Sequence, residues 1–326
     1  MELALYSPGG YYEQPKQIGR AGDFYTSVSV GPLFGELLAR QFATWLKDSQ
    51  LTELVEIGAH DGSLARDILN WFALHEPETA SKVNYSIIEP SLERRTWQQT
   101  TLSNIRLTVR WQDKLHDGIR GIVFSNELLD AMPAHRLRWD VSQQCWDEWL
   151  VDCERDRLIW RSGKLRQDLQ GFVPDVPDEL AKVLPDGFTI EVSSAAINWW
   201  ANASKSLEKG YLVAVDYGFS EQEFFRPDRS NGTARAYFQH RLVDDLLANV
   251  GAQDLTAHVN WTAIQRAGEN AGLQTDLFCS QEEFLTRILR KIADDQWTPE
   301  QIKQLKTLTH PGFLGRAFRV LVQNRK

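Results

Sequence analysis

A polar or glycine residue follows directly on each of four short apolar runs in the sequence. These residues are Gly58, Glu89, Asn126 with Glu127, and Asp216. If the runs are parallel strands, their carboxyl ends lie at one edge of a sheet, where open α/β sheets bind their ligands. We therefore expect these side chains to form a ligand site, in which carboxylates orient what binds and manage its protons.

The loop after the first run is Glu56-Ile57-Gly58-Ala59-His60-Asp61-Gly62-Ser63. A dinucleotide loop G-x-G-x-x-G would need glycine at positions 60 and 63, and a P-loop would need Gly-Lys-Ser/Thr, so neither pattern is met. The remaining pattern, E-x-G-x-x-x-G, lets the backbone approach a small ligand, and the next helix can hold a carboxylate on its free N–H groups. S-adenosylmethionine carries such a carboxylate, together with an ammonium that Glu56 or a backbone carbonyl could receive. The alternative is a plain turn between a strand and a helix.

Two further acidic residues fit an adenosine. Glu89 follows the second apolar run, where an acidic side chain can accept both ribose hydroxyls. Asp113 follows the third run and could take the adenine amino group, while Trp111 or Gln112 packs nearby. Acidic residues are also common on surfaces, which is the alternative for each. Taken in chain order with the glycine loop, they predict adenosine binding.

The elements that position these residues alternate between strand and helix. Strands are expected at 53–57, 84–88, 105–109, 121–124 and 211–215, and helices at 32–46, 63–74, 91–101 and 195–207. Such alternation predicts an α/β fold with a Rossmann-like, doubly wound and mostly parallel sheet.

The alternation breaks after the fourth strand. Between 134 and 160 apolar and polar residues alternate, which predicts a β-meander that ends in a proline-rich linker around Pro174, Pro177 and Pro185. Meander and linker together are expected at about 134–190. Its four tryptophans are expected to pack in the meander rather than to form a ligand cage. Helical segments near 243–249 and 262–271 and a last strand at 317–322 complete the prediction. We expect an N-terminal segment, 1–46, and one α/β domain, 47–326, into which the meander is inserted.

Two longer motifs carry a family resemblance. They are Gly22-Asp23-Phe24-Tyr25-Thr26-Ser27 and Ser125-Asn126-Glu127-Leu128-Leu129-Asp130-Ala131-Met132-Pro133. With the stretches 4–12, 31–35, 215–218 and 254–261, they make the chain resemble the MidA family of class I S-adenosylmethionine-dependent methyltransferases nearly end to end. That family includes the mitochondrial arginine methyltransferase that assists assembly of respiratory complex I.

The resemblance implies roles for individual residues. The family's cofactor loop falls on Glu56, Gly58 and Gly62, and its ribose acid falls on Glu89. The G-D-F-x-T-S segment, with Gly22, Asp23, Thr26 and Ser27, would lie over the cofactor pocket. The N-E-x-x-D-A-x-P segment would lie at the entrance to the catalytic site.

The chain departs from the family pattern at three places. The family's loop is nearer G-P-G-x-G-x, whereas this chain has His60 and Asp61. The common D-L-T-A-H-V-D-F is here D-L-T-A-H-V-N-W, and the E-x-S-P segment appears as Glu191-Val192-Ser193-Ser194. Relatives usually have a preceding helix, so a truncated or unusually short form is also expected. These changes bear on the target and the cofactor affinity more than on the fold.

An arginine substrate is cationic, so carboxylates must align its guanidinium during transfer. We expect Glu127 to be the guanidinium partner, Asn126 to shape the pocket, and Asp216 and His258 to lie nearby. A helix N-terminal cap is the favoured alternative for Asp130. A structural histidine is the alternative for His258.

Composition limits the partners. The net charge of −8 argues against a nonspecific nucleic-acid binder and suits a basic protein segment. Three cysteines without C-x-x-C spacing predict no zinc site and a reducing compartment. No apolar run is long enough to cross a membrane. We expect a cytoplasmic enzyme that binds S-adenosyl-L-methionine, no metal, and a protein substrate. A methyltransferase for a small molecule and a non-catalytic assembly factor on the same scaffold are the alternatives, and the oligomeric state is open.

Overall fold

The computed structural model describes residues 1–14, 26–239, 241–292 and 297–326. Its contacts divide the chain into two compact units. The sheet unit comprises Ile18–Leu128, Ala201–Tyr217 and Gly268–Lys326. The meander unit comprises Met1–Gln17, Leu129–Trp200 and Gly218–Ala267.

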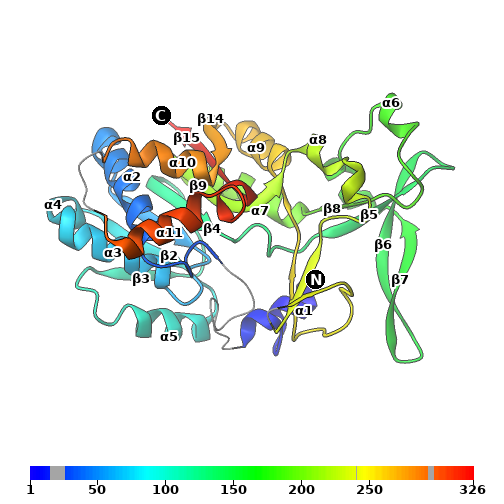
Figure 1. Cartoon of the computed structure of the whole chain (residues 1–326), viewed down its shortest axis with the longest axis horizontal. Helices are drawn as coiled ribbons and strands as arrows, with labels where there is room; N and C mark the ends of the chain where they lie inside the picture. The colour runs from blue at the N-terminus through cyan, green and yellow to red at the C-terminus, as the bar shows by residue number, and fades with distance from the viewer. Residues whose placement is uncertain (15–25, 240, 293–296) are drawn as a thin grey trace. The chain divides into compact units, whose positions relative to one another are not determined.

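The sheet unit is built on a long twisted sheet with the strand order β14-β15-β9-β4-β1-β2-β3 (Figure 1). Its strands are β1 Glu53–Ile57, β2 Asn84–Ile88, β3 Val109–Gln112, β4 Ile119–Asn126, β9 Leu207–Phe219, β14 Gln274–Ser280 and β15 Phe318–Arg325. Strands β3, β2, β1, β4 and β9 are mutually parallel, whereas β15 runs antiparallel to both β9 and β14. The carboxyl ends of the five parallel strands therefore share one edge. This arrangement confirms the predicted fold class.

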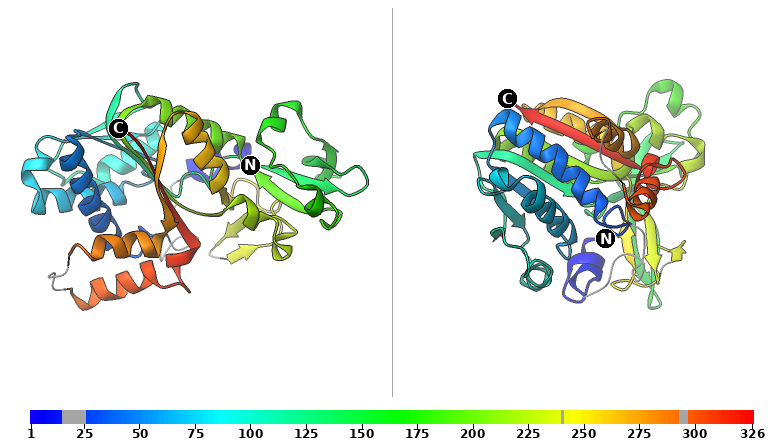
Figure 2. Two further views of the ribbon diagram at one scale, coloured as in Figure 1. Left: turned by 90° about the horizontal axis from the view of Figure 1, so that it is seen from above. Right: turned by 60° about the vertical axis from the view of Figure 1, so that its left-hand side comes forward.

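Helices cover this sheet. They are α2 Leu33–Ser49, α3 Ser63–His75, α4 Pro77–Ala80, α5 Leu92–Thr101, α10 Gln281–Leu289, α11 Pro299–Thr309 and α12 Leu314–Ala317. Helix α2 packs against α3, α10 and α11, as Figure 2 shows. It does so because Leu33, Leu37, Leu38 and Phe42 recur at helical spacing, and all four are buried.

The meander unit contains two small antiparallel sheets. One has the order β7-β6-β5-β8, with β5 His135–Asp140, β6 Cys145–Glu154, β7 Arg157–Lys164 and β8 Thr189–Val192. The other has the order β11-β10-β12, with β10 Arg235–Phe238, β11 Arg241–Val243 and β12 Asp254–Thr256. The two-residue strand β13, Val259–Asn260, pairs with the last residues of β9.

Short helices connect these sheets. They are α1 Glu2–Tyr6, η1 Tyr11–Glu13, η2 Gln167–Phe172, α6 Asp178–Ala181, α8 Glu221–Phe224 and η3 Pro227–Arg229. Two longer helices, α7 Ser194–Ser206 and α9 Trp261–Asn270, begin in the meander unit and end in the sheet unit.

The predicted β-meander is confirmed as β5, β6 and β7, but its tryptophans divide into two pairs. Trp139 and Trp146 are buried in its core, with ring centroids 5.2 Å apart. Trp149 and Trp160 are partly exposed and each lies under an arginine guanidinium. Packing therefore accounts fully for only the first pair.

Two predicted elements are wrong. A strand was expected at 105–109, but the third strand, β3, starts only at Val109. The turn that closes α5 extends through Ile105. Pairing with β2 begins at Val109, opposite Tyr85. The helix expected at 243–249 is a short strand and turns. There the Asp245 side chain accepts from the Leu247 backbone, and the Gln253 amide binds the carbonyls of Asp245 and Leu246, which competes with helical pairing.

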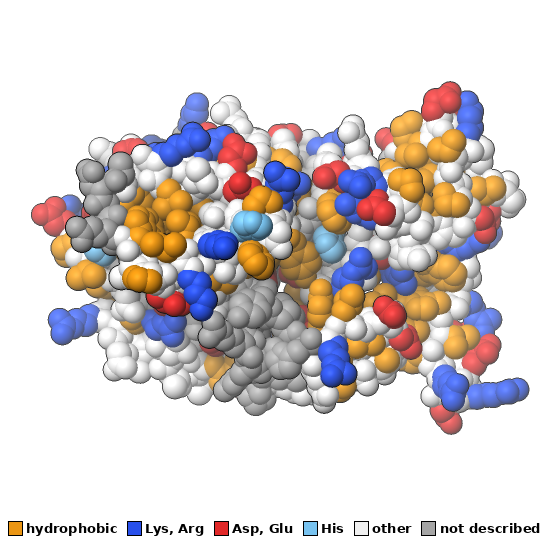
Figure 3. All heavy atoms as spheres, in the orientation of Figure 1, with side chains coloured by type: hydrophobic (Ala, Val, Ile, Leu, Met, Phe, Trp, Pro, Cys, Tyr) orange, Lys and Arg blue, Asp and Glu red, His pale blue; other side chains and the backbone are white. Residues whose placement is uncertain are grey.

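Within the described residues, no helix combines the length and the apolar character needed to span a bilayer. The same residues contain no group of three or more histidine, cysteine or acidic side chains arranged to hold a metal ion. On the face drawn in Figure 3, acidic and basic side chains are interspersed over the described surface.

Candidate functional site

The loop between β1 and α3 is held in an unusual backbone conformation. Gly58, His60 and Gly62 have φ angles of 72°, 46° and 85°. Glycine adopts this left-handed region without strain, whereas His60 adopts it at a cost. The loop therefore curls tightly where β1 ends.

Asp61 closes the loop onto α3. Its Oδ1 accepts from the backbone N–H of Ser63 at 2.9 Å, and its Oδ2 accepts from the Ser63 hydroxyl at 3.0 Å. Burial raises the pKa of Asp61, but hydrogen bonds from His60 and Ser63 outweigh burial and bring the pKa down to about 2. The chain's own carboxylate thus uses one of the helix N–H groups that the sequence suggested for a ligand carboxylate.

Glu56 is a buried carboxylate directly before the loop. The Tyr85 hydroxyl on β2 donates to Glu56 Oε2 at 2.5 Å. Burial raises the pKa of Glu56 to about 7, although the Tyr85 hydrogen bond lowers it, and Asp61 and Asp67 raise it further. A carboxyl that is half ionised near neutral pH would be ionised fully by a cation placed beside it.

Glu89 lies at the end of β2, the strand next to β1, and is almost fully buried. Its Oε1 accepts from the Ser91 backbone at 3.0 Å and lies 3.4 Å from Arg94 Nε, and its Oε2 accepts from the Gln98 amide at 3.2 Å. Because a carboxylate has about four acceptor positions, one hydrogen bond on each oxygen leaves capacity on each for a further donor.

Asp113 behaves differently from the two buried acids. Its side chain is 78% exposed and forms an ion pair with Arg95. The Arg95 Nε also donates to the Glu89 backbone carbonyl at 2.6 Å. Asp113 is therefore tied to the end of β2, next to Glu89, through one arginine.

The predicted catalytic residues of the sheet unit meet at the end of β4. Asn126 Nδ2 donates to Glu127 Oε1 at 3.0 Å, and Glu127 has a φ of 50°. Asp216 is buried on β9, where its Oδ2 accepts from Leu128 N at 3.1 Å and its Oδ1 from Tyr217 N at 2.8 Å. Asp216 thereby fixes the backbone that follows Glu127. A strained backbone at a non-glycine residue persists only where its surroundings enforce it, and it is common at active sites.

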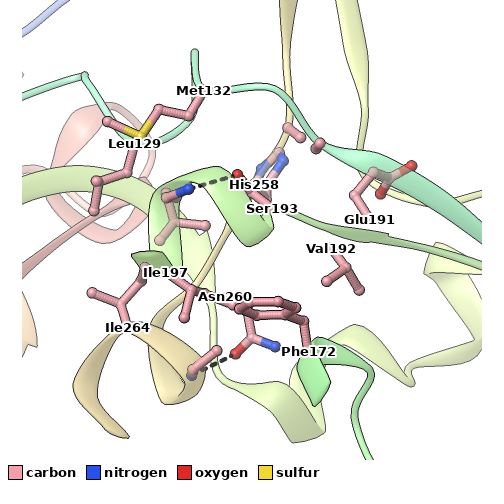
Figure 4. Close-up of a pocket in the computed structure, with 15 residues that line it drawn as sticks. Leu129, Met132, Phe172, Glu191, Val192, Ser193, Ile197, His258, Asn260 and Ile264 are labelled. Carbon is pink, nitrogen blue, oxygen red and sulfur yellow. Dashed lines mark hydrogen bonds between the residues drawn. The ribbon is translucent and has the colours of Figure 1, made fainter. Parts of the chain in front are cut away.

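His258 lies in the meander unit and lines a small pocket with Ser193, Asn260 and apolar side chains (Figure 4). Its Nδ1 is 3.1 Å from the Thr233 carbonyl, and its ring stacks on Phe219 at 4.7 Å. Burial lowers the pKa of His258 to about 4, although the Thr233 hydrogen bond raises it. The ring is therefore neutral at physiological pH, with its proton on Nδ1.

The cap expected for Asp130 is wrong, because a turn rather than a helix follows that residue. Asp130 is buried in the meander unit, and its carbonyl accepts from Ala257 N at 3.0 Å. Sequence reasoning missed two residues beside it, Tyr12 and Asp254. Tyr12 is partly buried, and burial together with the charges of Asp254 and Asp130 raises the pKa of Tyr12 well above its usual value. Both residues lie in stretches that resemble the family, 4–12 and 254–261, and this resemblance could have identified them as candidate site residues.

Four predicted residues belong to the segment that would cover the cofactor. Gly22 and Asp23 lie outside the described residues. The Ser27 hydroxyl donates to Gln281 Oε1 at 2.9 Å, and Thr26 Oγ1 accepts from Ser29 N at 3.0 Å. Ser27 is therefore anchored to α10 within the sheet unit.

Comparison with known proteins adds three findings. The model of a family described as putative S-adenosyl-L-methionine-dependent methyltransferase matches residues 37–279. The human mitochondrial protein arginine methyltransferase NDUFAF7 is 27% identical over 82% of this chain, which spans 64% of the human protein's length. The Drosophila melanogaster homologue is 24% identical over 98% of this chain and 79% of its own.

A crystal structure from Burkholderia thailandensis, of a candidate methyl transferase bound to S-adenosyl-homocysteine, has a TM-score of 0.86 and 28% identity. The match covers 99% of this chain and 86% of that one. The expected cytoplasmic location is overturned by the comparisons, because the curated relatives are named as mitochondrial proteins.

Proposed function

The chain belongs to this family of S-adenosyl-L-methionine-dependent methyltransferases, and from that premise we propose that it methylates an arginine side chain of a protein. The observation that carries the proposal is a row of carboxylates at the ends of adjacent parallel strands. Glu56 is the penultimate residue of β1, Glu89 follows β2 and Glu127 follows β4. The names of the human and Drosophila relatives support arginine as the target.

The residues at the ends of β1 and β2 fit S-adenosyl-L-methionine. Glu56 would receive its ammonium, and Gly58 and Gly62 would let the loop backbone lie against it. Each oxygen of Glu89 retains acceptor capacity for one ribose hydroxyl, and Asp113 would accept from the adenine amino group. Thr26 and Ser27 would cover the bound cofactor. When bound, the cofactor supplies a methyl group already activated on a sulfonium.

Glu127 and Asn126 would hold the guanidinium. A guanidinium presents N–H donors in a planar fork, which a carboxylate can pair in a bidentate manner. Asn126 fixes Glu127 through its Nδ2, while its own Oδ1 is buried and accepts no hydrogen bond from the described residues. That oxygen is a second acceptor for the substrate. A methylated guanidinium nitrogen must give up a proton, and Glu127 would be the group that takes it.

Asp216 would support the reaction. It holds the loop after β4 through Leu128 N, which would set the direction of Glu127. His258 belongs to the meander unit, where its ring is neutral and carries its proton on Nδ1, so we propose no cationic role for it.

A labelling experiment tests the proposal. The purified protein is incubated with S-adenosylmethionine carrying a labelled methyl group and with mitochondrial protein extract, and digests are analysed for methylarginine by mass spectrometry. Labelled arginine with the intact protein, and none with Glu127→Gln, is the expected result. Label only in small molecules, or no label while the cofactor binds, would contradict it and would favour a small-molecule enzyme or an assembly factor.

A further inference from the structure

One buried glutamine joins three segments of the proposed cofactor site. Gln98 lies on α5 and is fully buried. Its Nε2 donates to the His60 carbonyl at 3.0 Å and to Glu89 Oε2 at 3.2 Å. Its Oε1 accepts from Trp111 Nε1 on β3 at 2.8 Å. A single side chain therefore connects the loop after β1, the carboxylate after β2 and the aromatic residue of β3.

The chemistry of the three partners fixes which way the amide faces. An indole N–H can only donate, whereas a backbone carbonyl and an ionised carboxylate can only accept. Reversing the amide would place two acceptors against its oxygen and a donor against its NH₂ group. The network thus specifies glutamine, because neither glutamate nor an apolar residue can serve all three partners.

The same glutamine limits how the loop can move. A Cβ atom on Gly62 would lie 3.3 Å from Gln98 Cα, so the loop backbone is in close contact with α5 at this point. The hydrogen bond to the His60 carbonyl holds the residue whose φ of 46° is strained. Contact and hydrogen bond together fix the loop relative to Glu89.

We propose that Gln98 is the positioning residue for the adenosine half of the cofactor. It orients the Glu89 carboxylate toward the ribose hydroxyls and holds Trp111 at the adenine side, without touching the methyl group. The proposal rests on the proposed function, since it assumes an adenosine at these strand ends. It predicts that Gln98 governs cofactor affinity and leaves the rate at saturating cofactor nearly unchanged.

Two variants test this in the full chain. Gln98→Met keeps the length of the side chain but removes its hydrogen bonds. Because a hydrogen bond to a charged group is lost, the Kd for S-adenosylhomocysteine, measured by calorimetry, should rise about tenfold or more. In the labelling assay KM for S-adenosylmethionine should rise in parallel, with kcat within about threefold.

Gln98→Glu gives a readout that a merely structural role would not move. The variant keeps an acceptor for Trp111 but places a second carboxylate against Glu89. Repulsion between the two carboxylates favours a state in which they share one proton. When the pH is lowered enough for the pair to take up this proton, the carboxyl group can again donate a hydrogen bond, as the Gln98 amide does. The cofactor affinity of the variant should then recover toward that of the wild type at the same pH. Affinity of the wild type should show no such recovery.

Gln323→Met is the matched control. Gln323 is also a fully buried glutamine of the sheet unit, and its Nε2 donates to Thr275 Oγ1 at 3.0 Å, on strands β15 and β14. It should lower stability without changing cofactor affinity. Equal affinity loss in Gln323→Met, or unchanged affinity in Gln98→Met, would overturn the inference while the wild type still binds. Absence of binding by the wild type would instead contradict the proposed function.

Discussion

Replacing Glu56 by glutamine should remove a pH dependence from cofactor binding. Glu56 is buried, and burial raises its pKa to about 7, despite the hydrogen bond from Tyr85. Only the ionised carboxylate attracts the cofactor's ammonium. Cofactor affinity should therefore rise as pH increases through 7 in the wild type.

The size of the effect follows from the pKa. A group with a pKa of about 7 is roughly one-tenth ionised at pH 6 and nine-tenths ionised at pH 8. The Kd for S-adenosylhomocysteine should fall about tenfold between these values. Tyr85→Phe removes a hydrogen bond to the ionised form, worth roughly 1.5–3 kcal/mol, and should move the midpoint upward by about one to two pH units.

Calorimetric titration from pH 6 to pH 8.5 measures this dependence. The ligand's own amino group titrates identically with wild type and with Glu56→Gln, so the difference between the two profiles isolates Glu56. Weak, flat binding by Glu56→Gln after correction for the ligand supports the assignment. Parallel profiles for both proteins would refute it.

The same carboxyl should affect folding without cofactor. A raised pKa means that the folded state keeps a proton that the unfolded chain has lost. The contribution of this proton to the free energy of unfolding is full below about pH 4.5 and is lost as pH rises to about 7. The free energy of unfolding should fall by roughly 3 kcal/mol over this range. Denaturant unfolding at several pH values should show this slope in the wild type and lack it in Glu56→Gln.

Four further variants have defined outcomes. Glu127→Gln should lower kcat by about a hundredfold or more with cofactor Kd unchanged, and loss of both would contradict its role. Gly62→Ala should destabilise by about 1–3 kcal/mol in thermal unfolding, because φ is 85°; an unchanged Tm would count against the loop geometry. Burial lowers the pKa of His258 to about 4, so stability should fall as pH drops from 6.5 toward 4, and His258→Gln should reduce that loss. Asp113→Asn should raise cofactor Kd by less than about fivefold, since the carboxylate is exposed; a larger loss by calorimetry would contradict this.

The strand ends could be predicted because their signal is local. Apolar runs of five residues ending at Gly58 or Glu89 identify both a buried strand and its functional terminus. The same logic failed for β14, which the sequence did not reveal. It is an edge strand in which only Cys279 is buried, so its side chains follow no clear apolar alternation.

Gln98 and Asp216 show a second limit. A glutamine within a polar helix gives no sequence signal of burial, and its three partners are 9 to 38 residues away. Asp216 was expected to lie near Glu127, but the two backbone N–H groups from which its carboxylate accepts could not be identified from the sequence. Tertiary hydrogen bonds of this kind depend on strand order, which residue types alone do not encode.

Calorimetric titration of the purified protein with S-adenosylmethionine, beside a Glu89→Ala variant, tests whether the chain binds its cofactor at these strand ends. We expect micromolar binding by the intact protein and its loss in Glu89→Ala. An absence of binding by the intact protein, or equal binding by the variant, would contradict the assignment of the β1 and β2 strand ends as the cofactor site.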